Sequence, residues 1–321
     1  MYSDTPLGRL RLPVICSPMF LVSGPELVIA QCKAGVIGSF PALNAREGEG
    51  EPPQLEAWLK RITEELDAHN QANPDRPAAP FAVNQIVHRS NDRVERDIEI
   101  CARWKVPVWI TSMGAREDVN QAAHDCGGIV LHDVINNRFA RKAIDKGADG
   151  LIAVCAGAGG HAGTLSPFAL IQEIREWFDG PLALSGSIAS GRAILAAQAM
   201  GADFAYIGSA FIATAEAAAS EAYKQMIVEG TADDILYTSH FSGVNANYLK
   251  PSIRAVGLDP DNLTGEGNRL DLATGDIRPK AWRDIWGSGQ GIGAVHGVMS
   301  TAEYIDRLER EYHTARDALC A

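Results

Sequence analysis

One histidine, His161, lies in a loop with four glycines, at positions 157, 159, 160 and 163, and the loop follows the apolar run 150–154. Glycine carries no Cβ, so such a backbone can come close to a bound ligand. An imidazole titrates near neutral pH and is suited to proton transfer, and no other histidine of the chain lies in a loop of this kind. The loop therefore predicts a cofactor against the backbone, with His161 as an acid/base group beside it.

Two Gly-Ser pairs, Gly186-Ser187 and Gly208-Ser209, each stand where a predicted strand ends and a helix begins. Backbone N–H groups at such a junction, together with the helix dipole, favour a phosphate group. Barrel enzymes often bind phosphate at the loops after their seventh and eighth strands, where these two pairs fall. We expect the two pairs to form a phosphate site, with ordinary tight turns as the alternative.

Other side chains that could take part in a reaction lie near these loops. His132 ends a predicted strand, and the sequence leaves open whether it is a packed, hydrogen-bonded residue or a functional one. Cys155 has no basic neighbour in the sequence and is predicted to be a packing residue. His124 and Cys126, like His132 and Asp133, belong to no set of three or four ligands, so no metal site is expected.

The elements that must position these loops are short apolar runs that alternate with amphipathic segments. The runs are nearly continuous in apolar residues, as in strands covered on both faces. Glycines at 35, 127, 147 and 201 close several of the helical segments, as helix stops do. The predicted strands are 14–16, 36–40, 81–84, 108–111, 129–132, 151–154, 182–185 and 204–207, and the predicted helices are 25–34, 54–70, 92–104, 117–126, 137–146, 167–178 and 190–200.

Eight repeats of this unit favour an α/β fold of the closed (β/α)8 TIM-barrel type over an open, doubly wound sheet. The pattern changes after the eighth strand: 213–228 predicts a long alanine-rich helix, and 237–280 is polar and loop-rich. A segment of that length is a small subdomain or a lid. We therefore predict a barrel of residues 1–212 and 281–321, closed by an amphipathic helix over 301–319, with a helical and loop-rich subdomain, 213–280, inserted after strand 8.

The amino-acid composition limits the classes of partner that this protein is expected to bind. The formal net charge of −11 opposes binding to nucleic acid and to anionic membranes. The six cysteines are scattered with no CxxC pair, which is typical of a reducing cytoplasm. No signal peptide pattern is visible at the N-terminus, and no apolar run approaches the ~20 residues of a membrane span. A small-molecule substrate in a cleft fits this composition. A homodimer is compatible with it as well.

These features together resemble the nitronate monooxygenase family, also called 2-nitropropane dioxygenase-like proteins. The resemblance extends over almost the whole chain. Its marks are Ser17-Pro18-Met19, Val83-Asn84, the Gly-Gly-His-Ala-Gly loop at 159–163, Ser185-Gly186-Ser187-Ile188, Gly208-Ser209 and Ser288-Gly289-Gln290-Gly291. Members of the family are flavin mononucleotide (FMN) enzymes on a (β/α)8 barrel with an inserted subdomain.

The resemblance implies roles for individual residues. His161 would take the proton from the carbon beside a nitro group, or would hydrogen-bond the nitronate, while FMN passes electrons from the nitronate to O₂. The phosphate of FMN would lie on the two Gly-Ser pairs. The remaining flavin contacts would come from Met19, Asn84, Gly159, Gly160, Ser288, Gly289 and Gln290.

The chain also departs from the family pattern. Many relatives carry a lysine directly after the histidine of strand five, where this chain has Asp133. An acid there would disfavour an anionic reduced flavin. Two other flavin activities use a similar scaffold, NADH:quinone reductase and the enoyl reductases of fatty-acid synthesis, and a barrel that binds a phosphorylated ligand without redox chemistry is a third alternative.

Overall fold

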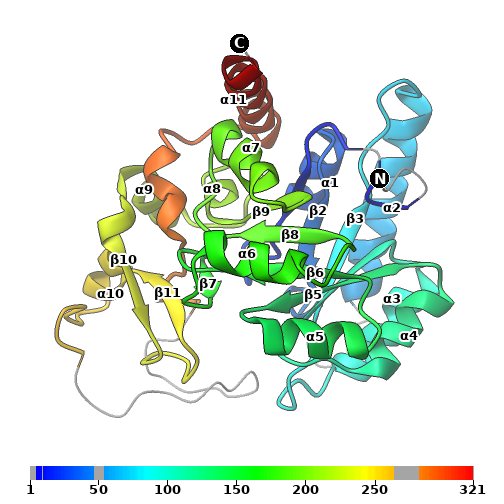
Figure 1. Ribbon diagram of the computed structural model, residues 1–321, viewed down its shortest axis with the longest axis horizontal. Helices are drawn as coiled ribbons and strands as arrows, with labels where there is room; N and C mark the ends of the chain where they lie inside the picture. The colour runs from blue at the N-terminus through cyan, green and yellow to red at the C-terminus, as the bar shows by residue number, and fades with distance from the viewer. Residues whose placement is uncertain (1–4, 9, 47–53, 264–281, 321) are drawn as a thin grey trace.

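The computed structural model describes residues 5–8, 10–46, 54–263 and 282–320. Its main sheet has eight parallel strands in the spatial order β1-β9-β8-β6-β5-β4-β3-β2 (Figure 1). A parallel bridge between Ile15 and Ile37 joins the first strand to the second and closes the ring. The predicted TIM barrel is confirmed, and the open sheet is excluded. The strands are β1 (Val14–Cys16), β2 (Gly38–Pro41), β3 (Phe81–Ile86), β4 (Val108–Ser112), β5 (Ile129–Val134), β6 (Gly150–Val154), β8 (Leu182–Ser185) and β9 (Phe204–Ile207).

Alternation along each strand sorts its side chains between the barrel interior and the helix layer. Ile110, Leu131 and Ile152 pack together inside the barrel, whereas Trp109 and Leu151 pack in the larger cluster outside it. The next inward positions towards the carboxyl ends of the strands are mostly polar. Five of these residues, which we call the polar layer, are Ser17, Ser112, Asp133, Ser185 and Tyr206.

The seven predicted helices between the strands are all present, and their ends differ from the prediction by a few residues. Gly35 and Gly147 follow two of them with φ of +91° and +88°, the left-handed conformation of a helix stop. Asn136 and Ser190 cap α5 and α7 by accepting backbone N–H groups of the first turn. The helices are α1 (Pro25–Lys33), α2 (Gln54–Ala72), α3 (Val94–Arg103), α4 (Glu117–Asp125), α5 (Asn137–Asp145), α6 (Pro167–Arg175) and α7 (Gly191–Ala199).

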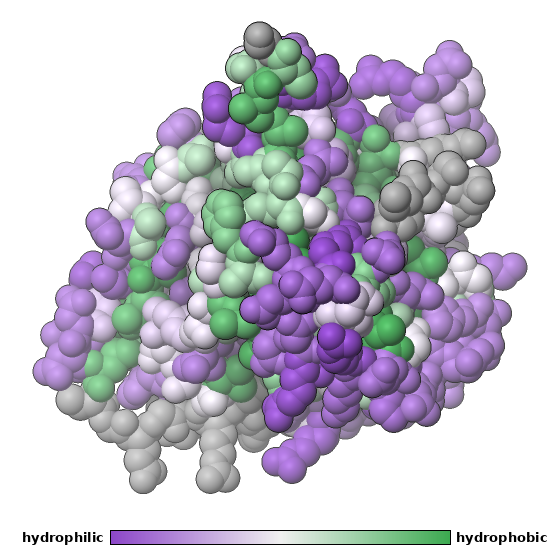
Figure 2. Space-filling view, viewed as in Figure 1, coloured by the Kyte–Doolittle hydropathy of each residue, from purple (hydrophilic) through white to green (hydrophobic). Residues whose placement is uncertain are grey.

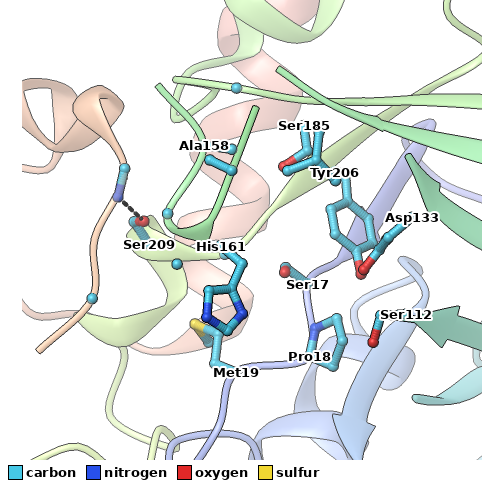
Figure 3. Close-up of a pocket in the computed structure, with 18 of the residues that line it drawn as sticks. Ser17, Pro18, Met19, Ser112, Asp133, Ala158, His161, Ser185, Tyr206 and Ser209 are labelled. Atoms are coloured by element: carbon cyan, nitrogen blue, oxygen red, sulfur yellow. Dashed lines mark hydrogen bonds between the residues drawn. The ribbon is translucent and has the colours of Figure 1, made fainter. Parts of the chain in front are cut away.

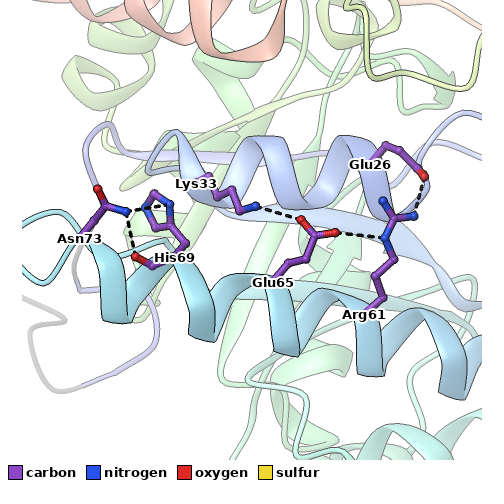
Figure 4. Close-up of polar contacts among 6 residues, drawn as sticks. All are labelled: Glu26, Lys33, Arg61, Glu65, His69 and Asn73. Atoms are coloured by element: carbon purple, nitrogen blue, oxygen red, sulfur yellow. Dashed lines mark hydrogen bonds and ion pairs between the residues drawn. The ribbon is translucent and has the colours of Figure 1, made fainter.

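An ion-pair network joins α1 to α2 on the outside of the barrel (Figure 4). Glu65 accepts a hydrogen bond from Lys33 Nζ at 2.9 Å and one from Arg61 Nε at 3.2 Å. Arg61 also bonds Glu26 across the two helices at 2.5 Å. The Lys33 ammonium group, ahead of Arg61, holds the pKa of the Glu65 carboxyl below its usual range. Each charge in this network has a partner and access to water.

The C-terminal helix α11 (Thr301–Cys320) lies beside α7 (Figure 1). Gly191 permits the close contact, because a Cβ there would come within 2.1 Å of the Leu308 carbonyl oxygen. The Gly191 N–H donates to Glu311 Oε2 at 2.8 Å, and the Tyr312 hydroxyl donates to Gln198 Oε1 at 2.7 Å. The predicted closing helix is therefore present. Among the described residues, no helix is both long and apolar enough to cross a bilayer.

The prediction of one helix over 213–228 is wrong. A short helix, α8 (Ser209–Ile212), ends before this segment, and α9 (Glu221–Glu229) begins inside it. Between them the backbone pairs with distant segments: Ala215 N–H donates to the Met299 carbonyl and Ala218 N–H to the Val22 carbonyl. These bonds replace the i→i−4 bonds of a helix, and Ser220 then caps α9 by accepting the Tyr223 N–H.

The inserted segment contains a β-hairpin as well as helix and loop. Its strands, β10 (Ile235–Thr238) and β11 (Ala246–Leu249), pair antiparallel, and β11 also pairs with the two-residue strand β7 (Gly160–His161). Figure 1 shows the hairpin to one side of the barrel, next to β7, with α10 (Lys250–Ala255) following it. The insert therefore reaches the barrel at the histidine of the glycine loop. Residues 264–280 of the predicted subdomain lie outside the described residues.

Candidate active site

A cavity of about 760 Å³ opens at the carboxyl ends of the barrel strands. This is the end at which barrel enzymes place their active sites. Most of the predicted site residues line it: Met19, Asn84, Gly159, Gly160, His161, Gly186, Ser187, Gly208, Ser209 and Gly289. Ser288, which is buried, and Gln290, which is exposed, are not among the residues that line the cavity. The Ser288 N–H donates to the Asn247 carbonyl at 3.2 Å and the Gln290 N–H to the Gly157 carbonyl at 2.9 Å.

Gly159 and Gly289 meet in the cavity wall. A Cβ at Gly159 would lie 2.8 Å from the Gly289 nitrogen and 2.9 Å from Ser209 Oγ. The same Ser209 Oγ accepts the Gly289 N–H at 2.8 Å, a bond that Figure 3 draws as a dashed line. The absence of Cβ atoms thus lets three chain segments come together here, from the glycine loop, the start of α8 and the segment after the insert.

The two Gly-Ser pairs follow neighbouring strands. β8 and β9 are paired in register, with Ser185 opposite Tyr206, so the turns that leave them lie at the same edge of the cavity. Ser187 has a φ of +56°, a left-handed conformation that non-glycine residues rarely adopt. Such strained positions cluster at functional sites. The two turns that the sequence assigns to a phosphate are therefore neighbours that face one cavity.

His161 lines the cavity from β7, and its ring is held by residues that sequence reasoning missed. His161 Nε2 lies 3.3 Å from Ser242 Oγ, to which the Tyr248 hydroxyl donates at 3.2 Å. The ring meets the Trp282 ring edge-on, with centroids 5.4 Å apart. Burial lowers the pKa of His161 to about 4, so the imidazole is neutral at neutral pH. We call His161, Ser242, Tyr248 and Trp282 the histidine cluster.

Nothing in the local sequence marks Ser242, Tyr248 or Trp282. They come from the insert and from the segment after it, and the antiparallel pairing of β11 with β7 places Ala246 opposite His161. The only sequence signal was the polar insert itself, because a long polar segment after strand eight must pack against something.

The polar layer lies on the barrel side of the cavity, and Figure 3 shows Asp133, Tyr206 and Ser17 together there. Asp133 Oδ1 and the Tyr206 hydroxyl are buried and make no hydrogen bond to any residue that the structure describes. Burial raises the pKa of Asp133 to about 7. Burial, and then the Asp133 carboxyl, raise the pKa of the Tyr206 phenol, and the nearby Ser17 side chain opposes them although it makes no well-formed hydrogen bond to the phenol. A buried polar atom without a partner is costly, so this layer is suited to a polar ligand.

The preceding residue, His132, also lines the cavity, and its ring is hydrogen-bonded to the neighbouring strand. Its Nδ1 is hydrogen-bonded to Thr111 Oγ1 at 2.6 Å, and the side chain is 6% exposed. Burial, and secondly the Lys142 ammonium group, lower the pKa of His132 to about 4. His132 is therefore a packed, hydrogen-bonded residue that also contributes to the cavity wall, so both alternatives left open by the sequence remain. Cys155 is likewise buried in the outer cluster, and burial raises the pKa of its thiol to about 12, as expected for a packing residue.

A closed (β/α)8 barrel with a concave cavity at its strand ends, lined by glycine turns and a half-buried neutral histidine, is typical of an enzyme that acts on small molecules. A family model described as nitronate monooxygenase matches residues 5–311. The chain therefore belongs to the nitronate monooxygenase family, and it is an oxidoreductase.

Individual relatives agree with this assignment. The nitronate monooxygenase of Paraburkholderia phytofirmans is 27% identical in an alignment 351 positions long, which covers 95% of this chain and 93% of the relative. Among solved structures, FabK from Thermotoga maritima has a TM-score of 0.77 at 22% identity and covers 99% of this chain and 97% of its own. A nitroalkane oxidase from Streptomyces ansochromogenes has a TM-score of 0.73 at 22% identity, with 97% and 98% coverage. At these identities the two structures are evidence for the fold.

Proposed function

We propose that this enzyme binds FMN in the cavity and oxidises alkyl nitronates with O₂, and that it accepts neutral nitroalkanes when His161 takes their proton. The observation that carries the proposal is a half-buried, neutral imidazole on the wall of a cavity whose edge holds two neighbouring Gly-Ser turns. Family membership favours the same substrate class. The scattered cysteines support a cytoplasmic location.

The residues present fit a flavin. The cavity volume of about 760 Å³ lies in the range that holds cofactor-sized ligands. Gly186, Ser187, Gly208 and Ser209 would hold the phosphate through backbone N–H groups. Met19, Asn84 and the wall at Gly159, Gly160 and Gly289 would contact the rest of the cofactor, and the unpartnered Asp133 and Tyr206 groups offer hydrogen bonds to its polar atoms. Bound FMN would supply the transfer of electrons from the nitronate to O₂.

His161 acts on the substrate carbon. A neutral nitroalkane carries an acidic hydrogen on the carbon next to the nitro group. The imidazole takes that proton as the C–H bond breaks, and the electron pair moves into the nitro group to give the nitronate anion. The imidazolium that forms lies beside the new negative charge and stabilises it in a site with little water. A preformed nitronate needs no such step.

Anaerobic reduction of the purified protein tests the proposal. A yellow protein whose flavin absorbance bleaches on addition of a nitronate, and only slowly with NADH or NADPH, is the expected result. Rapid bleaching by NADH with no response to nitronates would assign the chain to the NAD(P)H-dependent alternatives, quinone or enoyl reduction. A colourless protein that takes up no FMN would leave a barrel that binds a phosphorylated ligand.

A further inference from the structure

The histidine cluster determines more than the position of the imidazole. We propose that Ser242 is a positioning residue that fixes the proton of His161 on Nε2 and so leaves Nδ1 as the basic nitrogen in the cavity. The catalytic consequence rests on the proposed function, because it assumes that His161 acts as a base. The assignment of the ring proton rests on the hydrogen bonds alone.

The argument begins with the single hydrogen of the Ser242 hydroxyl. Ser242 Oγ lies 3.0 Å from the carbonyl oxygen of Val244, and a carbonyl can only accept. This contact is shorter than the 3.3 Å between Ser242 Oγ and His161 Nε2. No other hydrogen bond to this carbonyl is found in the described part of the chain. The serine hydrogen therefore goes to Val244.

The two lone pairs of Ser242 Oγ remain for incoming donors. The Tyr248 hydroxyl donates to Ser242 Oγ at 3.2 Å, and this fills one of them. The other faces His161 Nε2. Since the serine has no second hydrogen to give, the contact is a hydrogen bond only if Nε2 carries the proton. One donated and two accepted bonds complete the capacity of the hydroxyl.

Neutral imidazole has a single N–H, so a proton on Nε2 leaves Nδ1 with a free lone pair. Burial keeps the ring neutral at neutral pH. Nδ1 has no hydrogen-bond partner among the described residues, and the side chain that bears it lines the cavity. Figure 3 shows the imidazole extending from β7 towards Met19. The nitrogen available to a substrate is therefore the unprotonated one.

The cluster is rigid enough to hold this arrangement. Ser242 and Tyr248 are 2% and 0% exposed. The Tyr248 ring packs against the rings of Phe241 and Trp282, with centroids 5.2 and 5.1 Å apart. Tyr248 is part of β11, the strand that pairs with β7. The same insert thus supplies the strand that positions His161 and the hydroxyl that orients its proton.

The experiment is ¹⁵N NMR of the purified full-length protein with labelled histidine, in which the ¹⁵N shifts and ¹H–¹⁵N couplings show which ring nitrogen carries the proton. The His161→Gln variant identifies the signals of His161. We expect Nε2–H in the wild type and a mixture of both tautomers in Ser242→Ala. A proton on Nδ1 in the wild type overturns the proposal, and this outcome does not depend on whether Ser242→Ala folds.

Kinetics provides the second readout. Ser242→Ala should lower kcat on a neutral nitroalkane roughly tenfold, the value of one lost hydrogen bond, with KM and the turnover of preformed nitronate within about twofold of wild type. Ser252→Ala is the matched control, since Ser252 is also a buried serine of the insert, bonded to the Leu249 carbonyl and the Trp286 N–H but not to His161. An equal loss of kcat in both variants would contradict a specific role for Ser242.

The two proposals fail separately. If the wild-type proton is on Nε2 and the tautomers mix in Ser242→Ala, the assignment of Ser242 holds even for a protein that turns over no nitronate, and only the proposed function falls. If nitronate is oxidised but the proton lies on Nδ1, the proposed function holds and the role of Ser242 falls.

Discussion

The two sides of the cavity differ in how their polar groups are satisfied. In the histidine cluster, the Ser242 hydroxyl makes three hydrogen bonds within the protein, so the ring of His161 is held in place before any ligand binds and only its Nδ1 is left for a substrate. In the polar layer, Asp133 Oδ1 and the Tyr206 hydroxyl have no partner among the described residues. A preorganised group suits a reaction step, whereas unpartnered groups suit the binding of something else. The proposed function therefore places the chemistry on the insert side and cofactor binding on the barrel side.

The largest effect should come from removing the imidazole. His161→Ala should lower the turnover of neutral nitroalkane by about 10²- to 10⁴-fold, because proton abstraction is lost. Preformed nitronate should lose less than about tenfold, and FMN should stay bound, because the barrel side is unchanged. Steady-state kinetics on both substrate forms and the flavin absorbance measure this. An equal loss on both forms would mean that His161 binds the substrate rather than taking its proton.

The unequal success of sequence reasoning follows the same division. The barrel side is encoded locally: each strand is a nearly continuous apolar run, glycines end helices α1 and α5, and the Gly-Ser turns follow from strand order. The contacts of the insert side are not encoded in the local sequence. The alanines of 213–220 favour a helix, but their N–H groups pair with Met299 and Val22, which the local sequence does not reveal. Ser242 becomes part of the site only because β11 adds to β7.

The Gly159→Ala variant tests the close contact of Gly159 with Gly289 and Ser209, where the two sides of the cavity meet. The added Cβ would come within 3 Å of both the Gly289 nitrogen and Ser209 Oγ, so the wall must open. Overpacking of this kind costs about 1–3 kcal/mol of folding stability, and because the displaced wall would contact the cofactor we also expect FMN affinity to fall, measured by flavin fluorescence on reconstitution of the apoprotein. Gly297→Ala is the control, because its Cβ would meet nothing within 4 Å. Wild-type affinity in Gly159→Ala would show that the wall does not contact the cofactor.

The Asp133→Asn variant tests the side of the cavity with unpartnered groups, through the pH dependence of the unfolding free energy. The pKa of Asp133 is raised to about 7 from an ordinary 3.8, so the folded apoprotein keeps this proton where the unfolded chain has lost it. Wild-type stability is therefore reduced as pH rises from about 4 to about 7, by at most about 4 kcal/mol. The variant has no such carboxyl.

We expect similar unfolding free energies for wild type and Asp133→Asn at pH 4, and a more stable variant at pH 8, measured by urea denaturation of the apoproteins at both values. Asp145→Asn, which alters an exposed carboxyl on α5, controls for the loss of one negative charge. A variant that is less stable than wild type at pH 8 would mean that Asp133 is ionised and well partnered, and the contrast between the two sides of the cavity would disappear.

The smallest effect, with the opposite sign, should come from Glu65→Gln on the outside of the barrel. Lys33 and Arg61 lower the pKa of the Glu65 carboxyl, so its stabilisation is present above an ordinary pKa of 4.5 and is lost as pH falls through the lower, folded value. Solvent screens this half-exposed pair, and we expect a loss of about 0.2–1 kcal/mol at pH 8 that shrinks in high salt. Glu64→Gln should cost less, since the one ion pair of Glu64 within the described residues is with Lys60, at 3.8 Å. Asp133→Asn and Glu65→Gln both convert an acid to its amide. Changes of opposite sign in the unfolding free energy at pH 8 would show that the contribution of a carboxylate to stability depends on whether it has a partner.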